Sequence, residues 1–193
     1  DIHLEEGSPI AIRVNSDIRI LDNVLSQQAM DQLLSELLSD EKLEAYKKSG
    51  DLDTSVGLEG LSRIRINVYV ANNKRCLTLR ILPDDLPRWE DLGLPQPLID
   101  LTSKNRGLVL CTGPTGSGKS TTLAAFINCI LETQKRHILT IEDPIEFEFT
   151  HSKHSIIHQR EVKRDTQSFA SALRAALRED PDVIYIGEMR DLE

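Results

Sequence analysis

Long apolar runs, aromatic residues and cysteines are all scarce in this 193-residue chain. No apolar stretch approaches the roughly 18 residues that a membrane-spanning helix needs, so we predict no integral membrane segment. Phe, Tyr and Trp together make up 4% of the sequence and form no tract on which nucleic-acid bases could stack. The three cysteines, Cys76, Cys111 and Cys129, are far apart and fit no metal-binding spacing, which favours buried thiols in a reducing cytoplasm.

Positive charge is also in short supply. The chain has 23 Lys and Arg residues against 31 Asp and Glu residues, which gives a formal net charge of -8 at pH 7. Both halves are acidic and no basic stripe stands out, so we predict no nucleic-acid partner. The remaining composition, 39% hydrophobic and 28% charged, is that of an ordinary soluble protein with one or two domains.

Both ends of the chain suggest a fragment. The sequence begins at Asp1 with neither an initiating methionine nor an apolar signal region, and it stops at Glu193 just past an apolar run. No internal repeat or low-complexity tract occurs. We therefore interpret the chain as part of a longer protein.

Residues 1–82 mix strand and helix patterns. An alternating stretch around Asn15-Ser16-Asp17 predicts a hairpin, and a second pair of strands is predicted on either side of Asn72-Asn73. Between the pairs, Ser26 is a predicted N-cap of a helix, and Gly50 ends a shorter charged helix. The first helix places five apolar residues on one face: Met30, Leu33, Leu34, Leu37 and Leu38.

Residues 83–106 form a predicted linker region. The stretch "PDDLPRWEDLGLPQP" contains four prolines and a glycine and separates two compositions. A helix from about Pro97 to Ser103 leads out of it. The only tryptophan, Trp89, lies in this region, where we interpret it as a packing anchor rather than a platform for a ligand.

Residues 107–193 alternate strand and helix. "GLVLCT" is an apolar run without alternation, which predicts a strand buried on both faces. Strands are also predicted at "HILTIE" and "VIYIG", and "DTQSFASALRAALRED" predicts a helix that Pro181 ends. This order implies a parallel sheet with right-handed crossovers, so the fold class is α/β.

The segment "GPTGSGKSTT" matches the phosphate-binding pattern G-x-x-x-x-G-K-[ST] in full. Its glycines allow backbone angles at which successive N–H groups surround a phosphate, and the following helix N-terminus adds partial positive charge. Lys119 is expected to neutralise the β- and γ-phosphates of ATP, and the Ser120 hydroxyl is expected to hold Mg²⁺. The predicted nucleotide-binding residues are Gly113, Pro114, Thr115, Gly116, Ser117, Gly118, Lys119, Ser120 and Thr121.

Carboxylates follow two of the predicted strands, where open α/β sheets bind ligands. Glu142, Asp143 and Glu146 lie in "TIEDPIEF", and "VIYIGEMRD" places Glu188 where P-loop enzymes end their Walker B strand. We expect Glu188 to hold Mg²⁺, directly or through water, and Glu142 to polarise the attacking water. The sequence leaves open an exchange of these two roles.

Two further groups of residues have competing interpretations. The histidines at 151, 154 and 158 have intervals that would align on a helix, but "SIIHQREV" is typical of a strand or loop, so we favour a polar surface over a metal site. Arg63, Arg65 and Arg80 lie on the non-core face of predicted strands. They either face solvent or reach the nucleotide of a neighbouring subunit. The same ambiguity surrounds Arg174, Arg178 and Arg190.

Several quoted stretches together carry a family resemblance. "GLVLCTGPTGSGKSTTLAA", "HILTIEDPIEF", "HQREV" and "ALREDPDVIYIGEMRDLE" resemble the secretion-ATPase superfamily, most of all its type IV pilus retraction, or twitching motility, branch of PilT-like proteins. "DIHLEEGSPIAIRV", "RIRINVY" and "DLGLP" resemble the N-terminal domain of that family. The resemblance covers almost the whole chain.

The resemblance implies a PAS-like α+β domain over residues 1–82 and a RecA-like P-loop ATPase domain over residues 107–193. The second domain would be incomplete, because the family continues into a histidine-containing motif and a helical domain. The resemblance also implies a cytoplasmic homo-hexamer, recruited to the inner membrane by a platform protein, with ATP between subunits. It favours the trans role for Arg63, Arg65 or Arg80, and it places residues 92–94 near adenine.

Three functions follow from these expectations. The first is an ATP-hydrolysing motor for pilus retraction, with pilus assembly or secretion as the alternative direction of work. The second is a nucleotide-binding scaffold without turnover, against which the intact Glu142 and Glu188 argue. The third is a DNA-translocating motor, which the acidic composition disfavours. We do not expect the fragment alone to hydrolyse ATP at a normal rate.

Overall fold

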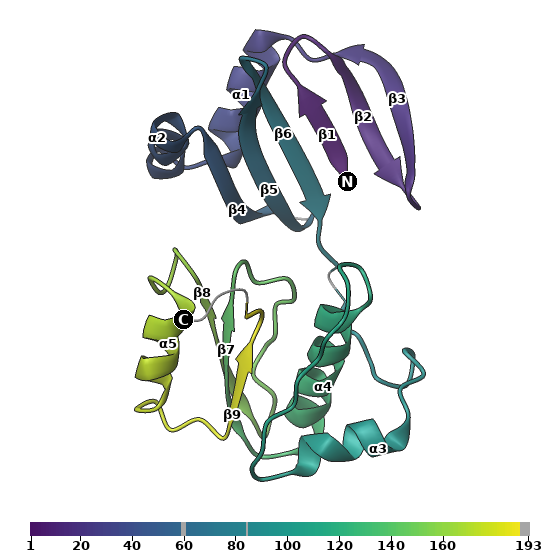
Figure 1. Cartoon of the computed structure of the whole chain (residues 1–193), viewed down its shortest axis with the longest axis vertical. Helices are drawn as coiled ribbons and strands as arrows, with labels where there is room; N and C mark the ends of the chain where they lie inside the picture. Colours follow the sequence, from purple (N-terminus) through teal and green to yellow (C-terminus); the bar gives the residue numbers. More distant parts are fainter. Residues whose placement is uncertain (59–60, 84, 190–193) are drawn as a thin grey trace. The chain divides into compact units, whose positions relative to one another are not determined.

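A computed structural model describes residues 1–58, 61–83 and 85–189, and it divides into two compact units, Asp1–Leu82 and Pro83–Glu193 (Figure 1). Arg190, one of the arginines with competing interpretations, and Asp191, the last residue of "VIYIGEMRD", lie outside the described residues. Within the described part of the chain, no helix has both the length and the apolar character that crossing a membrane requires.

The first unit is built on a six-stranded antiparallel sheet with the order β3-β2-β1-β6-β5-β4. Its strands are β1 (Ile2–Glu5), β2 (Pro9–Val14), β3 (Asp17–Val24), β4 (Asp51–Leu58), β5 (Leu61–Ala71) and β6 (Lys74–Ile81). Two helices, α1 (Gln27–Leu37) and α2 (Asp40–Ser49), lie between β3 and β4 in the chain and pack on one face of the sheet (Figure 1).

Local signals set the turns and helix ends of this unit. Both predicted hairpin turns are confirmed: Asn15 and Ser16 have φ of 49° and 73°, and Asn72 and Asn73 have φ of 51° and 60°. Two consecutive left-handed residues match the right-handed twist of the strands, and Asn tolerates this conformation well. The N-cap at Ser26 and the end of α2 at Gly50 are also confirmed.

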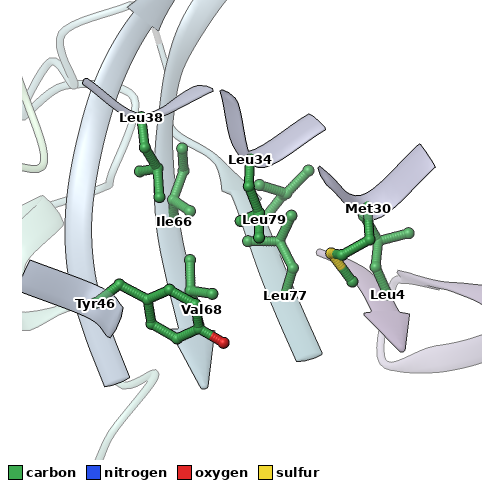
Figure 2. Packing of buried hydrophobic residues seen from close by; sticks show 9 residues of the cluster. All are labelled: Leu4, Met30, Leu34, Leu38, Tyr46, Ile66, Val68, Leu77 and Leu79. Carbon is green, nitrogen blue, oxygen red and sulfur yellow. The ribbon is translucent and has the colours of Figure 1, made fainter. Parts of the chain in front are cut away.

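The core of the first unit lies between the helices and the sheet (Figure 2). Met30 and Leu34 of α1 are almost fully buried against Ile66 and Val68 of β5 and Leu77 of β6, as the periodicity predicts. The other buried members of this cluster are Leu4, Leu38, Tyr46 and Leu79.

The second unit contains a three-stranded parallel sheet with the order β8-β7-β9, which confirms the predicted parallel sheet. Its elements are α3 (Gln96–Ile99), the 3-10 helix η1 (Asp100–Ser103), α4 (Lys119–Thr133), β7 (His137–Glu142), β8 (Ile156–Glu161), α5 (Phe169–Ala176) and β9 (Val183–Ile186). The predicted linker, residues 83–106, belongs to this unit, where the Gln134 side chain donates to the Thr102 carbonyl at 3.0 Å.

The helices α4 and α5 pack against opposite faces of β7. Ile127, Ile130 and Leu131 of α4 pack against Ile138, whereas Ala172 of α5 packs near Ile141. Because successive strand residues point to opposite faces, Thr140 and Glu142 share the face of Ile138, which is the face that α4 covers. The helix that begins at the glycine loop therefore lies over the strand that ends in Glu142.

Three sequence expectations for the second unit were wrong. "GLVLCT" forms no strand and does not join the sheet β8-β7-β9, and Leu108 is 82% exposed. The helix α5 ends at Ala176, well before Pro181, and Asp180 already has φ of 54°. Cys111 is only half-buried, although Cys76 and Cys129 are buried and all three are free thiols.

Candidate functional site

The glycine loop has the backbone that its sequence predicts. Gly116 and Gly118 have φ of 78° and 87°, a region that residues with a side chain rarely adopt. A Cβ atom on Gly113 would lie 2.7 Å from the Ser117 Oγ, which is closer than contact allows. This loop conformation therefore requires Gly116 and Gly118, whereas a side chain at position 113 would force the Ser117 hydroxyl to move.

The loop opens directly into the N-terminus of α4. No side chain caps this helix, so hydrogen bonds from capping groups do not occupy its first amides. The Lys119 ammonium turns back over the loop and donates to the carbonyl oxygens of Gly113 at 3.0 Å and Pro114 at 2.9 Å. Amides, a helix dipole and an ammonium thus meet at an exposed turn, an arrangement suited to anions.

Ser120 and the two predicted carboxylates line one cavity of about 60 Å³. Ser120 comes from the first turn of α4, Glu142 from the end of β7 and Glu188 from the segment after β9. The remaining lining residues are Asp143, Pro144, Glu146, Tyr185 and Gly187. The fold therefore brings together three residues that are far apart in the sequence.

Glu142 is buried, with 4% of its surface exposed. Its Oε1 accepts hydrogen bonds from the Thr140 Oγ1 at 2.6 Å and the Gln159 Nε2 at 3.2 Å. Burial raises the pKa of the Glu142 carboxyl, and these two hydrogen bonds act in the opposite direction. Gly187 lies against this side chain, because a Cβ there would lie 3.4 Å from the Cα and Cγ of Glu142.

Sequence reasoning missed Tyr185, Thr140 and Gln159. Burial, together with the carboxylates of Glu142 and Glu146, raises the pKa of Tyr185, so its phenol stays protonated beside the acids. One available signal was a polar residue two positions before Glu142 in an otherwise apolar strand, because such residues share a face. The contribution of Gln159 depends on strand pairing, which the sequence does not give.

The three candidate arginines have partners within the first unit. Arg63 donates to the Ser55 Oγ at 2.6 Å, and Arg65 forms a two-point ion pair with Asp53, with distances of 2.6 Å and 3.1 Å. Arg80 donates to the Asp1 carboxylate at 2.8 Å. Arg65 and Arg80 line a polar hollow of about 430 Å³ with Asp53, Asn67, Tyr69 and Thr78.

The histidines lie on a polar surface, and the rings of His151 and His158 are neighbours, with centroids 5.7 Å apart. His151, His154 and His158 are exposed, and the His158 Nδ1 lies 3.0 Å from the His137 Nε2. Across the described ranges, no group of three or more His, Cys, Asp and Glu side chains has a geometry that could hold a metal ion. Trp89 is half-buried, and Arg174 and Arg178 are exposed.

A phosphate-binding loop that opens the helix over a parallel sheet, with acids at the strand ends, defines the class of P-loop α/β proteins. The family model described as "Type II/IV secretion system protein" matches residues 1–193, and the chain belongs to this family.

The relatives include pilus motors. The chain is 43% identical over its whole length to the type IV pilus retraction ATPase PilT of Pseudomonas aeruginosa and covers 56% of that protein. It is 45% identical over 183 residues to a twitching motility protein of Neisseria gonorrhoeae, across 94% of this chain and 49% of the relative. These matches confirm the resemblance to the retraction branch, and the chain spans about half the length of the curated relatives it matches.

A solved structure matches as well. The crystal structure of the pilus retraction motor PilT with bound ADP superposes with a TM-score of 0.92 and 47% identity, and the match covers 99% of this chain and 56% of that one. The predicted mixed α/β fold, an antiparallel N-terminal sheet followed by a parallel sheet, is thereby confirmed.

Proposed function

We propose that this chain binds ATP with Mg²⁺ and hydrolyses it as part of a homo-hexameric motor that powers type IV pilus retraction. The observation that carries the proposal is the single cavity lined by Ser120, Glu142 and Glu188 at the head of the glycine-loop helix. The similarity to pilus retraction ATPases supports the direction of work.

The residues present fit a triphosphate and a divalent cation. The loop from Gly113 to Thr121 would hold the phosphates through its amides, and the Lys119 ammonium would exchange its carbonyl partners for phosphate oxygens. The hydroxyl of Ser120 and the carboxylate of Glu188 are the oxygen ligands that Mg²⁺ prefers. Bound Mg²⁺ supplies charge neutralisation on the phosphates.

Glu142 is the better candidate to orient the attacking water. Its carboxylate is buried and its Oε1 is held by two donors, which fixes the direction in which it accepts a proton. Glu188 is only half-buried and follows the strand that occupies the Walker B place. We assign water activation to Glu142 and the cation to Glu188.

The arginines of the first unit would act across a subunit boundary. Arg63, Arg65 and Arg80 lie on the sheet face opposite the helices, where a neighbouring subunit can approach. Their partners Ser55, Asp53 and Asp1 hold the guanidinium groups in fixed directions. In a cytoplasmic ring recruited by an inner-membrane platform protein, these cations would stabilise phosphate charge, and residues 92–94 would contact adenine.

The first experiment removes the ammonium from the site. In the full-length protein, Lys119→Ala is expected to lower ATP turnover by on the order of 100-fold or more, because one preorganised cation at the phosphates is lost. Lys135→Ala, which removes an exposed lysine just after α4, is the matched control and should keep normal turnover. Normal phosphate release from the Lys119→Ala protein would refute the proposal.

A second experiment separates a motor from a scaffold. Glu188→Gln should retain nucleotide binding and lose phosphate release in the full-length protein. Equal and negligible release from the unmodified protein and from this variant would favour the scaffold.

A further inference from the structure

A row of polar residues crosses the three-stranded sheet two positions before Glu142 on β7. Thr140 of β7 is paired in register with Gln159 of β8 and with Tyr185 of β9. Two residues further along the strands, Glu142 of β7 is paired in register with Glu161 of β8. Since residues two apart share a face, Thr140 and Glu142 both face α4.

Thr140 is an unusual residue for its position. It is 0% exposed and lies between Leu139 and Ile141, which are 1% and 0% exposed. A buried hydroxyl without a partner is unfavourable, so such a group normally has a hydrogen-bond acceptor. Here that acceptor is the Glu142 Oε1 at 2.6 Å, a short and charge-assisted hydrogen bond.

Gln159 links the same carboxylate to the loop that follows it. Its Nε2 donates to the Glu142 Oε1 at 3.2 Å and to the Phe147 carbonyl at 2.8 Å, and its Oε1 accepts from the Phe149 amide at 2.8 Å. One side chain on β8 therefore fixes both the acid at the end of β7 and the chain up to Phe149. A displacement of residues 143–149 would therefore also displace the Glu142 carboxylate through Gln159.

We propose that Thr140 and Gln159 are positioning residues for Glu142, with Thr140 fixing the direction of its carboxylate and Gln159 coupling it to residues 143–149. This inference rests on the proposed function, because it assumes that Glu142 orients the attacking water. Both donors reach the same oxygen, Oε1, and so determine the plane in which the carboxylate lies.

Positioning has a direct consequence for protonation. A donor that bonds the ionised form lowers the pKa of a buried carboxyl, so loss of the Thr140 hydroxyl should raise the pKa of Glu142 further. Other titratable groups face the same space: Asp143, Glu146, Tyr185 and Glu188 line the cavity, Glu161 is the register neighbour, and Lys119 begins α4. None of these groups is changed by a substitution at Thr140.

The test uses the full-length protein with Thr140→Val, which keeps the shape and removes the hydroxyl. We expect kcat for ATP to fall about 10- to 100-fold with little change in KM, because a displaced reacting group costs rate rather than ground-state binding. The acid limb of the kcat profile should move to higher pH. Thr140→Ser should restore both kcat and the pH profile.

Controls separate positioning from folding. Thr133→Val makes the same chemical change on the exposed end of α4 and should leave turnover unchanged. Gln159→Met, which removes the second donor and the link to the loop, should also lower kcat and increase amide hydrogen exchange in residues 143–149. Each variant is compared at the same folded fraction, measured by thermal unfolding.

Specific outcomes would overturn the inference. If Thr140→Val has a normal kcat and the acid limb of its pH profile does not move, the Thr140 hydroxyl does not position Glu142. A Thr140→Ser protein as impaired as Thr140→Val would show that packing alone matters. If Glu142→Gln is inactive while Thr140→Val is normal, only this inference fails, whereas normal turnover by Glu142→Gln removes the proposed role of Glu142 itself.

Discussion

Ionisation of the Glu142 carboxyl is unfavourable in the folded protein. Its carboxyl is buried, and burial raises its pKa in the folded protein above that of the unfolded chain. For such a group the ionised form destabilises the folded state at every pH above the folded pKa. The penalty declines as pH falls through the folded pKa, and it is absent below the unfolded pKa, where both states are protonated.

The residue-scale prediction follows from this sign. Glu142→Gln, which keeps the shape and retains an oxygen that can accept from Thr140 and Gln159, should stabilise the folded protein at pH 8. The gain should shrink as the pH is lowered towards 4, because the wild-type carboxyl then becomes neutral. Thermal unfolding at several pH values measures both effects. A variant less stable than wild type at pH 8 would contradict the expectation.

At the scale of single elements, local signals decide where helices begin. The Ser26 side chain accepts from the Ala29 amide at 3.1 Å and so satisfies one of the open donors of α1. This helix supplies Met30 and Leu34 to the first core, so its first turn supports residues that are almost fully buried.

Loss of this cap has a defined cost. Ser26→Ala should lower the free energy of unfolding by about 1 kcal/mol. Ser35→Ala is the matched control, because that hydroxyl donates only to the Gln32 carbonyl inside the exposed face of the same helix. Chemical denaturation measures the two variants, and equal losses from both would argue against a specific capping contribution.

The sequence predicted such local features well and long-range ones poorly. The turns at Asn15 and Asn72, the cap at Ser26 and the stop at Gly50 are written in a few neighbouring residues. The strand expected at "GLVLCT" failed because pairing needs a partner from elsewhere in the chain.

At the site, the same division holds. The glycines of the loop were predicted from their spacing, since their backbone angles are a local property. The polar row of Thr140 and Gln159 was not, because it exists only once β7 and β8 are in register. The roles proposed for Glu142, Glu188 and the arginines remain predictions for mutagenesis.

At the scale of the whole molecule, the chain consists of two units with separate cores. The cluster around Met30, Ile66 and Leu77 belongs to residues 1–82, and the clusters around Ile138 and Ile141 belong to the second unit. Separate cores allow one unit to lose stability while the other keeps its own packing.

Leu77→Ala tests this separation. Leu77 is 0% exposed, so its truncation should cost about 2–5 kcal/mol in the first unit. Amide hydrogen exchange should accelerate in β5 and β6 while β7 and β9 keep their protection. Uniform acceleration through both units would mean that the two cores unfold as one.

The folded-back ammonium of Lys119 bears on which ligands the loop selects. Because the carbonyls of Gly113 and Pro114 already satisfy it, an incoming molecule must compete with two neutral acceptors for the same donor. A polyanion wins this competition and a weakly charged metabolite does not, since charged acceptors form the stronger hydrogen bonds. We therefore expect the loop to discriminate between ligands by their negative charge, independently of the contacts that recognise their shape.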